Sequence, residues 1–192
     1  MNELPAPSRS SAAVRTDTPE ARRRWIVFGT LAVLIVVADQ ASKLWVDADF
    51  ANAWAHQAAP GLAAPTPVLG DLVRIAKSYN SGGLFGLFNA GAPLLALASL
   101  AVIGLLVYTQ ARSGAAGSML STIALGLLLG GALGNLADRI RLGFVIDWVD
   151  MGLGDLRWYT FNVADAAISI SIVALLVASF APARAHPLDP GR

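Results

Sequence analysis

The sequence predicts a helical membrane protein, in which a bundle of four membrane-spanning helices carries a small β element on one face. Three observations lead to this fold class. Of the 192 residues, 55% are hydrophobic and only 14% are charged, whereas soluble domains carry about 25% charged residues. The mean hydropathy is +0.58. The apolar residues are also gathered in blocks of about 20, the length that crosses roughly 30 Å of hydrocarbon.

The chain divides into a central membrane domain and two tails. Residues 1–24 are rich in Pro, Ser, Ala and Arg without an apolar period, so we expect a disordered basic tail. The membrane domain is expected to cover residues 25–181, and residues 182–192 form the second tail. Asp39 and Lys43 within the first apolar block favour a retained helix over a cleaved signal peptide. The predicted spans are residues 25–46, 92–111, 118–137 and 163–180.

Basic residues next to the spans predict the orientation. The arginine cluster at residues 22–24 precedes the first span and places the N-terminus in the cytoplasm. Four spans return the C-terminus to the same side, so both termini are expected to be cytoplasmic. Arg112 and Arg184 agree with this orientation, whereas Arg139, Arg141 and Arg157 fall in an outer segment and oppose it.

Two outer segments, residues 47–91 and 139–160, connect the spans on the other side. Residues 68–76 form a β-branched, partly alternating run that is typical of a strand, and residues 144–149 are a second short candidate. Together they predict a small sheet, or cradle, on the outer, periplasmic face. The connection at residues 112–117 is short enough to be a tight turn.

Composition narrows the chemistry that the chain can perform. The formal net charge of +1 offers no basic surface for nucleic acid. Cysteine is absent and only His56 and His186 are present, which removes thiolate chemistry and most His-based metal or Ser-His sites. Carboxylates remain as the main candidates for hydrolytic chemistry, so we expect no metal and no cofactor.

Several polar residues lie within or beside the spans, where they are costly and therefore candidates for function. Asp39 and Lys43 are four residues apart on one helix face and most simply neutralise each other, or else orient neighbours around a site. Asn135 needs hydrogen-bond partners at its depth. Asp138 and Arg139 are most simply a salt bridge, although Arg139 could instead hold a substrate carbonyl or fix the loop.

Two further aspartates border the last span. Asp165 lies three residues after Asn162, which on its own is explained as a capped helix start. Asp147 lies in an apolar run, where an edge strand could point it at water. Because the short outer segment leads back to the last span, Asp147 and Asp165 can meet near the outer interface. Other carboxylates are equally available to pair by this reasoning: Asp39, Asp138, Asp150 and Asp155.

Paired carboxylates in a poorly hydrated site share a proton, which gives one acid and one base near neutral pH. The base can take a proton from water that attacks a peptide carbonyl, and the acid can donate to the carbonyl oxygen. Aspartic-protease chemistry therefore fits the available residues. The alternative is a small proton-coupled transporter or channel subunit, which favours acids near the middle of the membrane, whereas these gather toward one face. A membrane scaffold would leave the Asn and Asp clusters unexplained.

Five sequence blocks, in this order and spacing, resemble the lipoprotein signal peptidases (signal peptidase II). They are Asp39-Gln40 with Lys43, and the blocks at residues 80–86, 131–139, 143–148 and 161–165. The family usually has two small residues where Gly83 and Leu84 stand and commonly Phe where Trp148 stands, which affects the substrate groove more than the chemistry.

The resemblance implies a catalytic dyad of Asp147 and Asp165. It also implies an enzyme of the bacterial inner membrane, without a cofactor and sensitive to globomycin. We expect this enzyme to be a monomer. The implied partners are membrane phospholipid and lipid-modified prolipoproteins, whose signal peptide is removed just before a diacylglyceryl-modified cysteine. The implied supporting or substrate-binding residues are Asp39, Lys43, Asn80, Gly82, Asn135, Asp138, Arg139 and Asn162.

Overall fold

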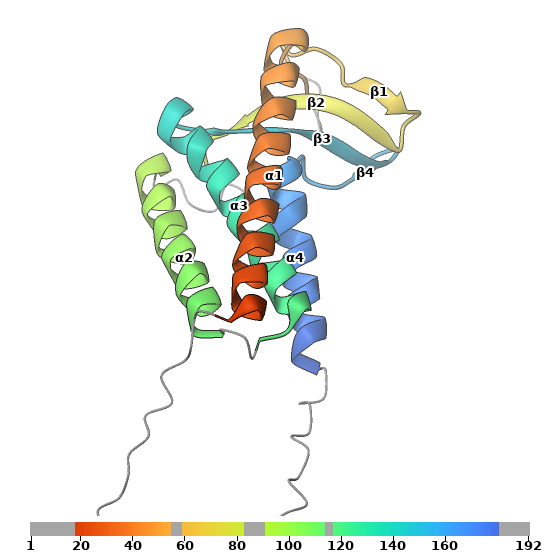
Figure 1. Cartoon of the computed structure of the whole chain (residues 1–192). Coiled ribbons are helices and arrows are strands. Elements are labelled where there is room, and N and C mark those ends of the chain that lie inside the picture. Colours follow the sequence, from red (N-terminus) through yellow and green to blue (C-terminus); the bar gives the residue numbers. More distant parts are fainter. Residues whose placement is uncertain (1–17, 55–58, 83–90, 114–116, 181–192) are drawn as a thin grey trace, which may run out of the picture.

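A computed structural model describes residues 18–54, 59–82, 91–113 and 117–180. Four helices in these ranges are long and apolar enough to cross a membrane, as predicted. They stand side by side as a bundle, and a small sheet projects from one end of it (Figure 1). The first residue of α1 and the last residue of α4 lie at the other end. The helices are α1 (Pro19–Asp49), α2 (Gly91–Ser113), α3 (Met119–Leu142) and α4 (Val163–Phe180).

Helix α1 begins earlier than the sequence predicted. The hydroxyl of Thr18 accepts a hydrogen bond from the Ala21 N–H at 3.2 Å, and Pro19 occupies the first turn. Residues 19–24, assigned to the disordered tail, are therefore helical, whereas residues 1–17 lie outside the described residues. Arginine is a good helix former, so a basic composition does not separate a tail from a helix that continues into water. At 31 residues, α1 is about 46 Å long.

Helix α3 also extends beyond its predicted end at residue 137. It continues to Leu142 and stops where Gly143 adopts a left-handed conformation with φ of 81°, its N–H donating to the Arg139 carbonyl at 3.1 Å. Asp138 and Arg139 thus lie inside the last turns rather than after the helix. The hydropathy pattern placed the end of this span too early because the final turns of the helix are polar on one side.

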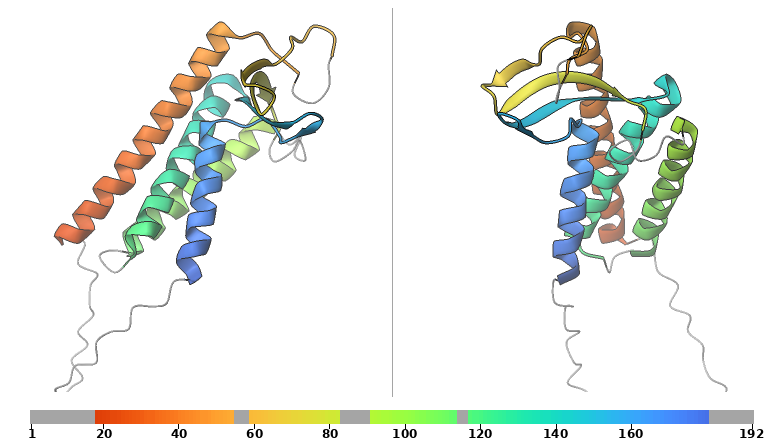
Figure 2. Two further views of the ribbon diagram at one scale, coloured as in Figure 1. Left: turned by 90° about the vertical axis from the view of Figure 1, so that its right-hand side faces the viewer. Right: turned by 180° about the vertical axis from the view of Figure 1, so that it is seen from behind.

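Helix α3 is the central helix of the bundle. Of its most apolar window 56% is buried, against 11 to 17% for the other three helices, whose windows mostly face outward. Leu125 and Leu129 of α3 pack with Phe28 and Ala32 of α1 in the apolar core of the bundle. Views from the side and from behind show α3 between its neighbours (Figure 2).

Glycines set the close approach of α3 to α1. A Cβ placed on Gly130 would lie 2.7 Å from the Ile35 Cβ and 2.8 Å from the Ala32 carbonyl oxygen. Small residues at such positions let helix backbones touch, as the glycine-rich segment predicted. The contact is tight against backbone, so the neighbouring helix cannot relax by moving a side chain.

We expect Gly130→Ala to lower the free energy of unfolding by about 1–3 kcal/mol, because the added methyl overpacks the α1–α3 contact. Gly104→Ala on α2 is the matched control, since a Cβ there meets nothing within 4 Å. It should be neutral or stabilising by up to about 1 kcal/mol. Unfolding of each variant in mixtures of mild detergent and dodecyl sulfate measures both values. Equal stabilities for the two variants would contradict this packing.

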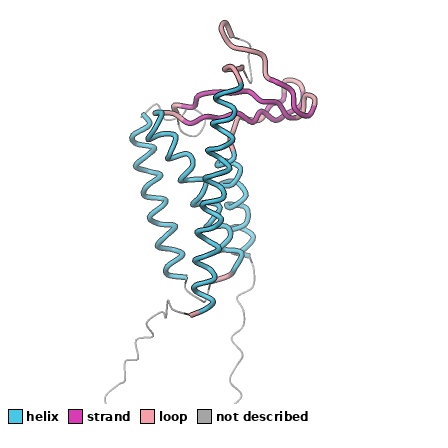
Figure 3. Tube along the Cα trace, turned by 45° about the horizontal axis from the view of Figure 1, so that its top comes forward, coloured by secondary structure: helices cyan, strands magenta, loops and turns pink. Residues whose placement is uncertain are grey.

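The sheet contains four antiparallel strands in the order β1-β2-β3-β4. The single strand expected at residues 68–76 is instead a hairpin, because the chain turns at Gly70 with φ of 53°. The strand expected at residues 144–149 is longer and is followed by a second hairpin. The strands lie across the end of the bundle (Figure 3). Their bounds are β1 (Thr66–Leu69), β2 (Val73–Asn80), β3 (Val145–Leu153) and β4 (Leu156–Arg157).

Contacts from both central strands fix the sheet to the helices. Lys77 of β2 donates to the backbone carbonyl of Asp47 at 3.1 Å and to its carboxylate at 3.2 Å, near the end of α1. A bridge between Val149 and Phe161 holds β3 against the segment that enters α4. The central strand β3 and the first turn of α4 are thereby placed side by side.

Candidate active site

Asp147 lies on β3 with its side chain buried; it is 4% exposed. The possibility that it points to water from an edge strand is therefore wrong, because β3 is flanked by β2 on one side and by Phe161 on the other. Its carboxylate accepts a hydrogen bond from the Asn80 amide at 2.9 Å and from the Asn162 amide at 2.7 Å. Both bonds favour the ionised carboxylate.

Asp165 lies in the first turn of α4 and exchanges hydrogen bonds with Asn162. Its N–H donates to the Asn162 side chain at 2.9 Å, and its carboxylate accepts from the Asn162 N–H at 3.3 Å. This reciprocal cap agrees with the simple explanation given by the sequence. The other carboxylate oxygen of Asp165 accepts a hydrogen bond from the Asn135 amide at 2.7 Å. Helix capping therefore explains only one of the two contacts that the Asp165 carboxylate makes.

Asn162 joins the two carboxylates. It is fully buried, and its amide nitrogen donates to Asp147 and also to the Asn135 side-chain oxygen at 3.1 Å. Asn135 in turn donates to Asp165. The two asparagines therefore hold Asp147 and Asp165 around one small polar site, and each amide is oriented by its donors and acceptors.

A buried ionic cluster underlies this site. The Lys43 ammonium lies 2.8 Å from Asp39, 2.8 Å from Asp138 and 3.0 Å from the Asn135 side-chain oxygen, and its side chain is 2% exposed. The predicted intrahelical pair is thus present, and Asp138 of a second helix, α3, is added to it. Asp39 also accepts the Ala164 N–H at 3.0 Å, which ties α1 to the start of α4. All three Lys43 donors have an acceptor.

The prediction that Asp138 and Arg139 form a salt bridge with each other is wrong. Asp138 pairs with Lys43 and accepts the Ile146 N–H at 3.3 Å, because neighbouring residues on a helix point about 100° apart. Arg139 is half-buried, and its charge acts on the carboxylates of Asp165, Asp147 and Asp138.

Gln40 was quoted within a motif but not assigned to the site, and it belongs there. Its amide donates to Asp138 at 2.9 Å and to the Gly134 carbonyl at 3.2 Å. A polar side chain next to Asp39 in an apolar helix was the signal available in the sequence. Gly82 lies just beyond β2, and the rest of its motif, residues 83–86, lies outside the described residues.

The other acids that could have paired are accounted for elsewhere. Asp150 is fully buried between two arginines, with the Arg74 guanidinium at 2.6 Å and that of Arg157 at 3.0 Å. Asp155 is exposed in the turn between β3 and β4. In the described chain, neither is hydrogen-bonded to Asn135 or Asn162. In the described ranges, no group of three His, Asp or Glu side chains is placed to hold a metal ion.

Asp147 and Asp165 differ from these acids in having no counter-ion in contact. Within the described chain, neither forms a salt bridge, whereas Asp39 and Asp138 share Lys43. The pKa of Asp147 is raised from 3.8 to about 7, chiefly by burial and then by the charge of Asp165. Hydrogen bonds from the two asparagine amides and the charge of Lys43 oppose this rise in pKa. One proton can therefore be held at this site near neutral pH.

The fold and the site together define a multi-pass membrane protein with a carboxylate-lined polar site at one end of its bundle. A model of the family described as signal peptidase (SPase) II matches residues 31–181. The chain belongs to this family, and it is a peptide-bond hydrolase.

Curated relatives cover most of the same region. A protein named lipoprotein signal peptidase from Methylorubrum extorquens (strain PA1) is 42% identical over 167 residues, covering 83% of this chain and 89% of that protein. One of the same name from Syntrophus aciditrophicus (strain SB) is 37% identical over 158 residues, covering 79% and 91%.

The fold is also that of a solved structure described as a bacterial membrane enzyme. The TM-score is 0.68 at 22% identity, with 82% of this chain and 87% of that chain covered. A second structure of the same description, at 21% identity, gives the same TM-score and covers 83% of this chain and 94% of that chain. The likeness extends to the arrangement of helices and sheet.

Proposed function

We propose that this protein is an aspartic endopeptidase that removes signal peptides from lipid-modified prolipoproteins, cleaving before the diacylglyceryl-modified cysteine. The observation that carries the proposal is the pair of buried carboxylates, Asp147 and Asp165. Asn135 and Asn162 connect them, and no cation in the described part of the chain neutralises them by contact. The names of the relatives support the substrate class.

The reaction needs one protonated and one ionised carboxyl group. The ionised carboxylate takes a proton from water while the water oxygen attacks the scissile carbonyl carbon. The protonated carboxyl donates to the carbonyl oxygen, which gives a neutral tetrahedral diol. Collapse of the diol breaks the C–N bond as a proton passes to the amine. In this proposal Asn80 and Asn162 keep the carboxyl groups oriented, and Arg139 holds a substrate carbonyl or the nearby loop.

The depth of the site suits a lipidated substrate. Asp165 is in the first turn of α4 and Asp147 is in the sheet above it, so the scissile bond lies at the membrane surface while acyl chains remain in hydrocarbon. We place the protein in the bacterial inner membrane, as a monomer. The site faces the periplasm, and both termini are cytoplasmic because the arginines at residues 22–24 mark the other end.

The substrate class is tested with the purified full chain and a prolipoprotein in mild detergent. We expect the diacylglyceryl-modified precursor to be shortened, as seen by gel mobility, and the same precursor without its lipid to remain intact. The same reaction with EDTA should proceed at the same rate, since no metal takes part in the proposed chemistry. Equal cleavage of both precursors would overturn the substrate class, and loss of activity with EDTA would overturn the mechanism.

The pH profile follows from the raised pKa of Asp147, which is about 7. Ionisation of Asp147 removes the acid, so we expect kcat/KM to fall as the pH rises through this value. Asn80→Ala removes a hydrogen bond that lowers this pKa and should move the falling limb to higher pH. Tyr79→Phe, which loses only the hydrogen bond to Asp47, should leave the limb in place. An unshifted limb in Asn80→Ala would contradict the role of Asp147.

A further inference from the structure

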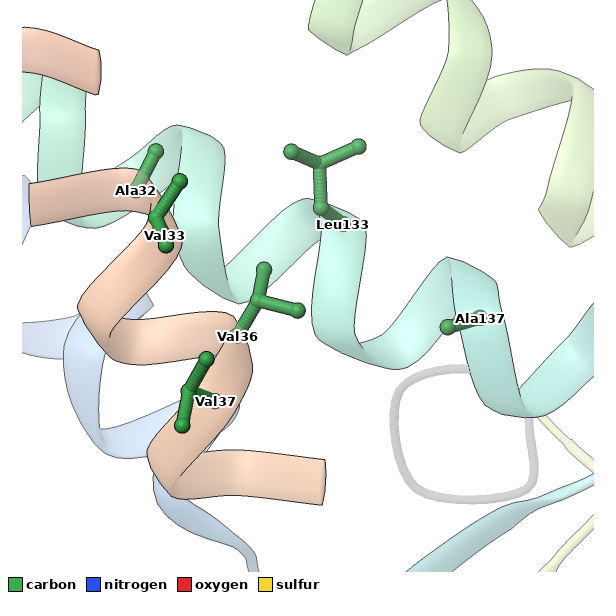
Figure 4. Close-up of a pocket in the computed structure, with 6 residues that line it drawn as sticks. All are labelled: Ala32, Val33, Val36, Val37, Leu133 and Ala137. Atoms are coloured by element: carbon green, nitrogen blue, oxygen red, sulfur yellow. The ribbon is translucent and has the colours of Figure 1, made fainter. Parts of the chain in front are cut away.

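An apolar groove lies between α1 and α3 on the outer surface of the bundle. Its volume is about 370 Å³, and every residue that lines it is aliphatic. In the close-up, the side chains of Val36 and Leu133 point into the space between the two helices (Figure 4). The lining residues are Ala32, Val33, Val36, Val37, Leu133 and Ala137.

The groove is separate from the active site. Leu133 and Ala137 are each two positions from Asn135, the residue that contacts Asp165. Two positions along an α-helix correspond to a rotation of about 200°. The groove therefore lies on the opposite side of α3 from the catalytic carboxylates.

A cation follows one helical turn beyond the groove, at the end near the sheet. The row of Leu133 and Ala137 on α3 continues after one more turn to Arg141, and the row of Val36 on α1 continues to Gln40. The Arg141 guanidinium donates to the Gln40 side-chain oxygen at 2.8 Å. Arg141 is exposed in the last turn of α3, where a membrane-spanning helix reaches the headgroup region.

An aliphatic channel that ends at an exposed guanidinium matches one kind of ligand, an acyl chain with a phosphate at its head. Arginine has five N–H donors in a planar fork that binds phosphate through paired hydrogen bonds. In the described chain, one of the Arg141 N–H groups donates to the Gln40 side-chain oxygen. The diacylglyceryl group of a lipidated peptide has acyl chains that fit the groove, but it has no phosphate to pair with the Arg141 guanidinium.

We propose that this groove and Arg141 bind an anionic phospholipid, with one acyl chain along the groove and the phosphate on Arg141. The lipid comes from the leaflet on the side of the sheet. The site requires only that the bundle spans a membrane, so it does not depend on the proposed peptidase reaction. Because Gln40 also bonds to Asp138 of α3, a bound phosphate on Arg141 braces the contact between α1 and α3.

Native mass spectrometry of the full chain in detergent tests this site, with dioleoyl phosphatidylglycerol as the probe. We expect Arg141→Gln and Leu133→Trp each to raise the Kd for this lipid about tenfold, by removing the phosphate contact and by filling the groove. Arg141→Lys should lose less affinity for the lipid, because lysine keeps the positive charge. Dioleoylglycerol, which has the same chains without phosphate, should bind the unaltered chain about as weakly as the phospholipid binds Arg141→Gln.

Matched controls lie on α2, away from the groove. Arg112→Gln removes an exposed arginine at the other end of the bundle, and Leu100→Trp adds bulk at a position that is 52% exposed. Both should bind as the unaltered chain does. If Leu133→Trp does not fold, Val37→Trp on α1 fills the same groove.

Three outcomes overturn the proposal. Unchanged lipid binding by Arg141→Gln would show that Arg141 does not contact the phosphate. Equal binding of dioleoylglycerol and the phospholipid would show that the site does not require a phosphate. Weakened binding in Arg141→Gln with full binding in both groove-filling variants would mean an adventitious anion at Arg141 only.

Discussion

Asp147→Asn and Asp165→Asn are each expected to reduce cleavage of the lipidated precursor by about a thousandfold or more. Each substitution keeps the size and shape of the side chain and removes its ability to accept or donate the transferred proton. The two carboxyl groups act as a unit, so the double variant should lose little more than either single variant. Initial rates of precursor shortening measure the effect.

A gain in stability should accompany the loss of activity in Asp147→Asn. In the unfolded chain Asp147 ionises near its ordinary pKa of 3.8, whereas in the folded protein it holds its proton up to about 7. The unfolded state therefore gains from ionisation over this window, and stability falls as the pH rises through it. Asparagine does not ionise, so the variant should be more stable than the unaltered chain at neutral pH.

This combination separates a catalytic role from a structural one. A variant that is inactive because it is misfolded would unfold more easily, not less. Asp155→Asn is the matched control, since Asp155 is an exposed acid in the turn between β3 and β4. It should retain full activity and unchanged stability. Substantial activity in either Asp147→Asn or Asp165→Asn would contradict the dyad.

Lys43→Met is expected to lower the free energy of unfolding by about 3–5 kcal/mol, the second large effect. Lys43 contacts Asp39 and Asp138, whose side chains are 0% and 2% exposed. Methionine fills a similar volume but leaves two carboxylates buried without a counter-ion. The unfolding of the variant in mixed detergents gives the value.

Lys77→Met is the matched control for this effect. Lys77 is nearly as buried, at 7%, but its partner Asp47 is 47% exposed and can be solvated without it. We expect a much smaller loss there. Replacing Asp138 by Asn in addition to Lys43→Met should recover part of the stability, because one uncompensated charge is removed. Equal losses for Lys43→Met and Lys77→Met would mean that the cluster is not a buried ionic unit.

The sequence predicted the helices because hydrophobic length is a strong signal in a membrane protein. Helix α4 was predicted with its observed bounds, at residues 163–180. The start of α1 and the end of α3 were missed because polar turns of these helices extend past the hydrocarbon. Hydropathy does not distinguish such turns from a loop. Thr18 and Gly143 mark these ends by their capping chemistry.

The sheet was predicted less well, because its pairing depends on turns and long-range contacts. One strand was predicted where Gly70 reverses the chain into a hairpin. The placement of Asp147 on a central strand was equally inaccessible, since an apolar run does not reveal which neighbours flank it.

The members of the site were predicted largely through the family resemblance and only partly through the residues themselves. Residue chemistry identified the acids but could not choose a pair, because pairing depends on which acids meet a cation. The structure supplies this selection: Lys43 neutralises Asp39 and Asp138, and Arg74 and Arg157 neutralise Asp150. Asp147 and Asp165 are left connected through asparagine amides.

Infrared titration of the carboxyl stretch tests most directly whether Asp147 and Asp165 together hold one proton near neutral pH. Spectra of the unaltered chain, Asp147→Asn and Asp155→Asn would be compared on either side of pH 7. We predict a protonated carboxyl band that disappears as the pH rises through about 7, that persists in Asp155→Asn, and that is absent in Asp147→Asn. A band that titrates near the ordinary pKa of an aspartate, or that is unchanged in Asp147→Asn, would contradict the account.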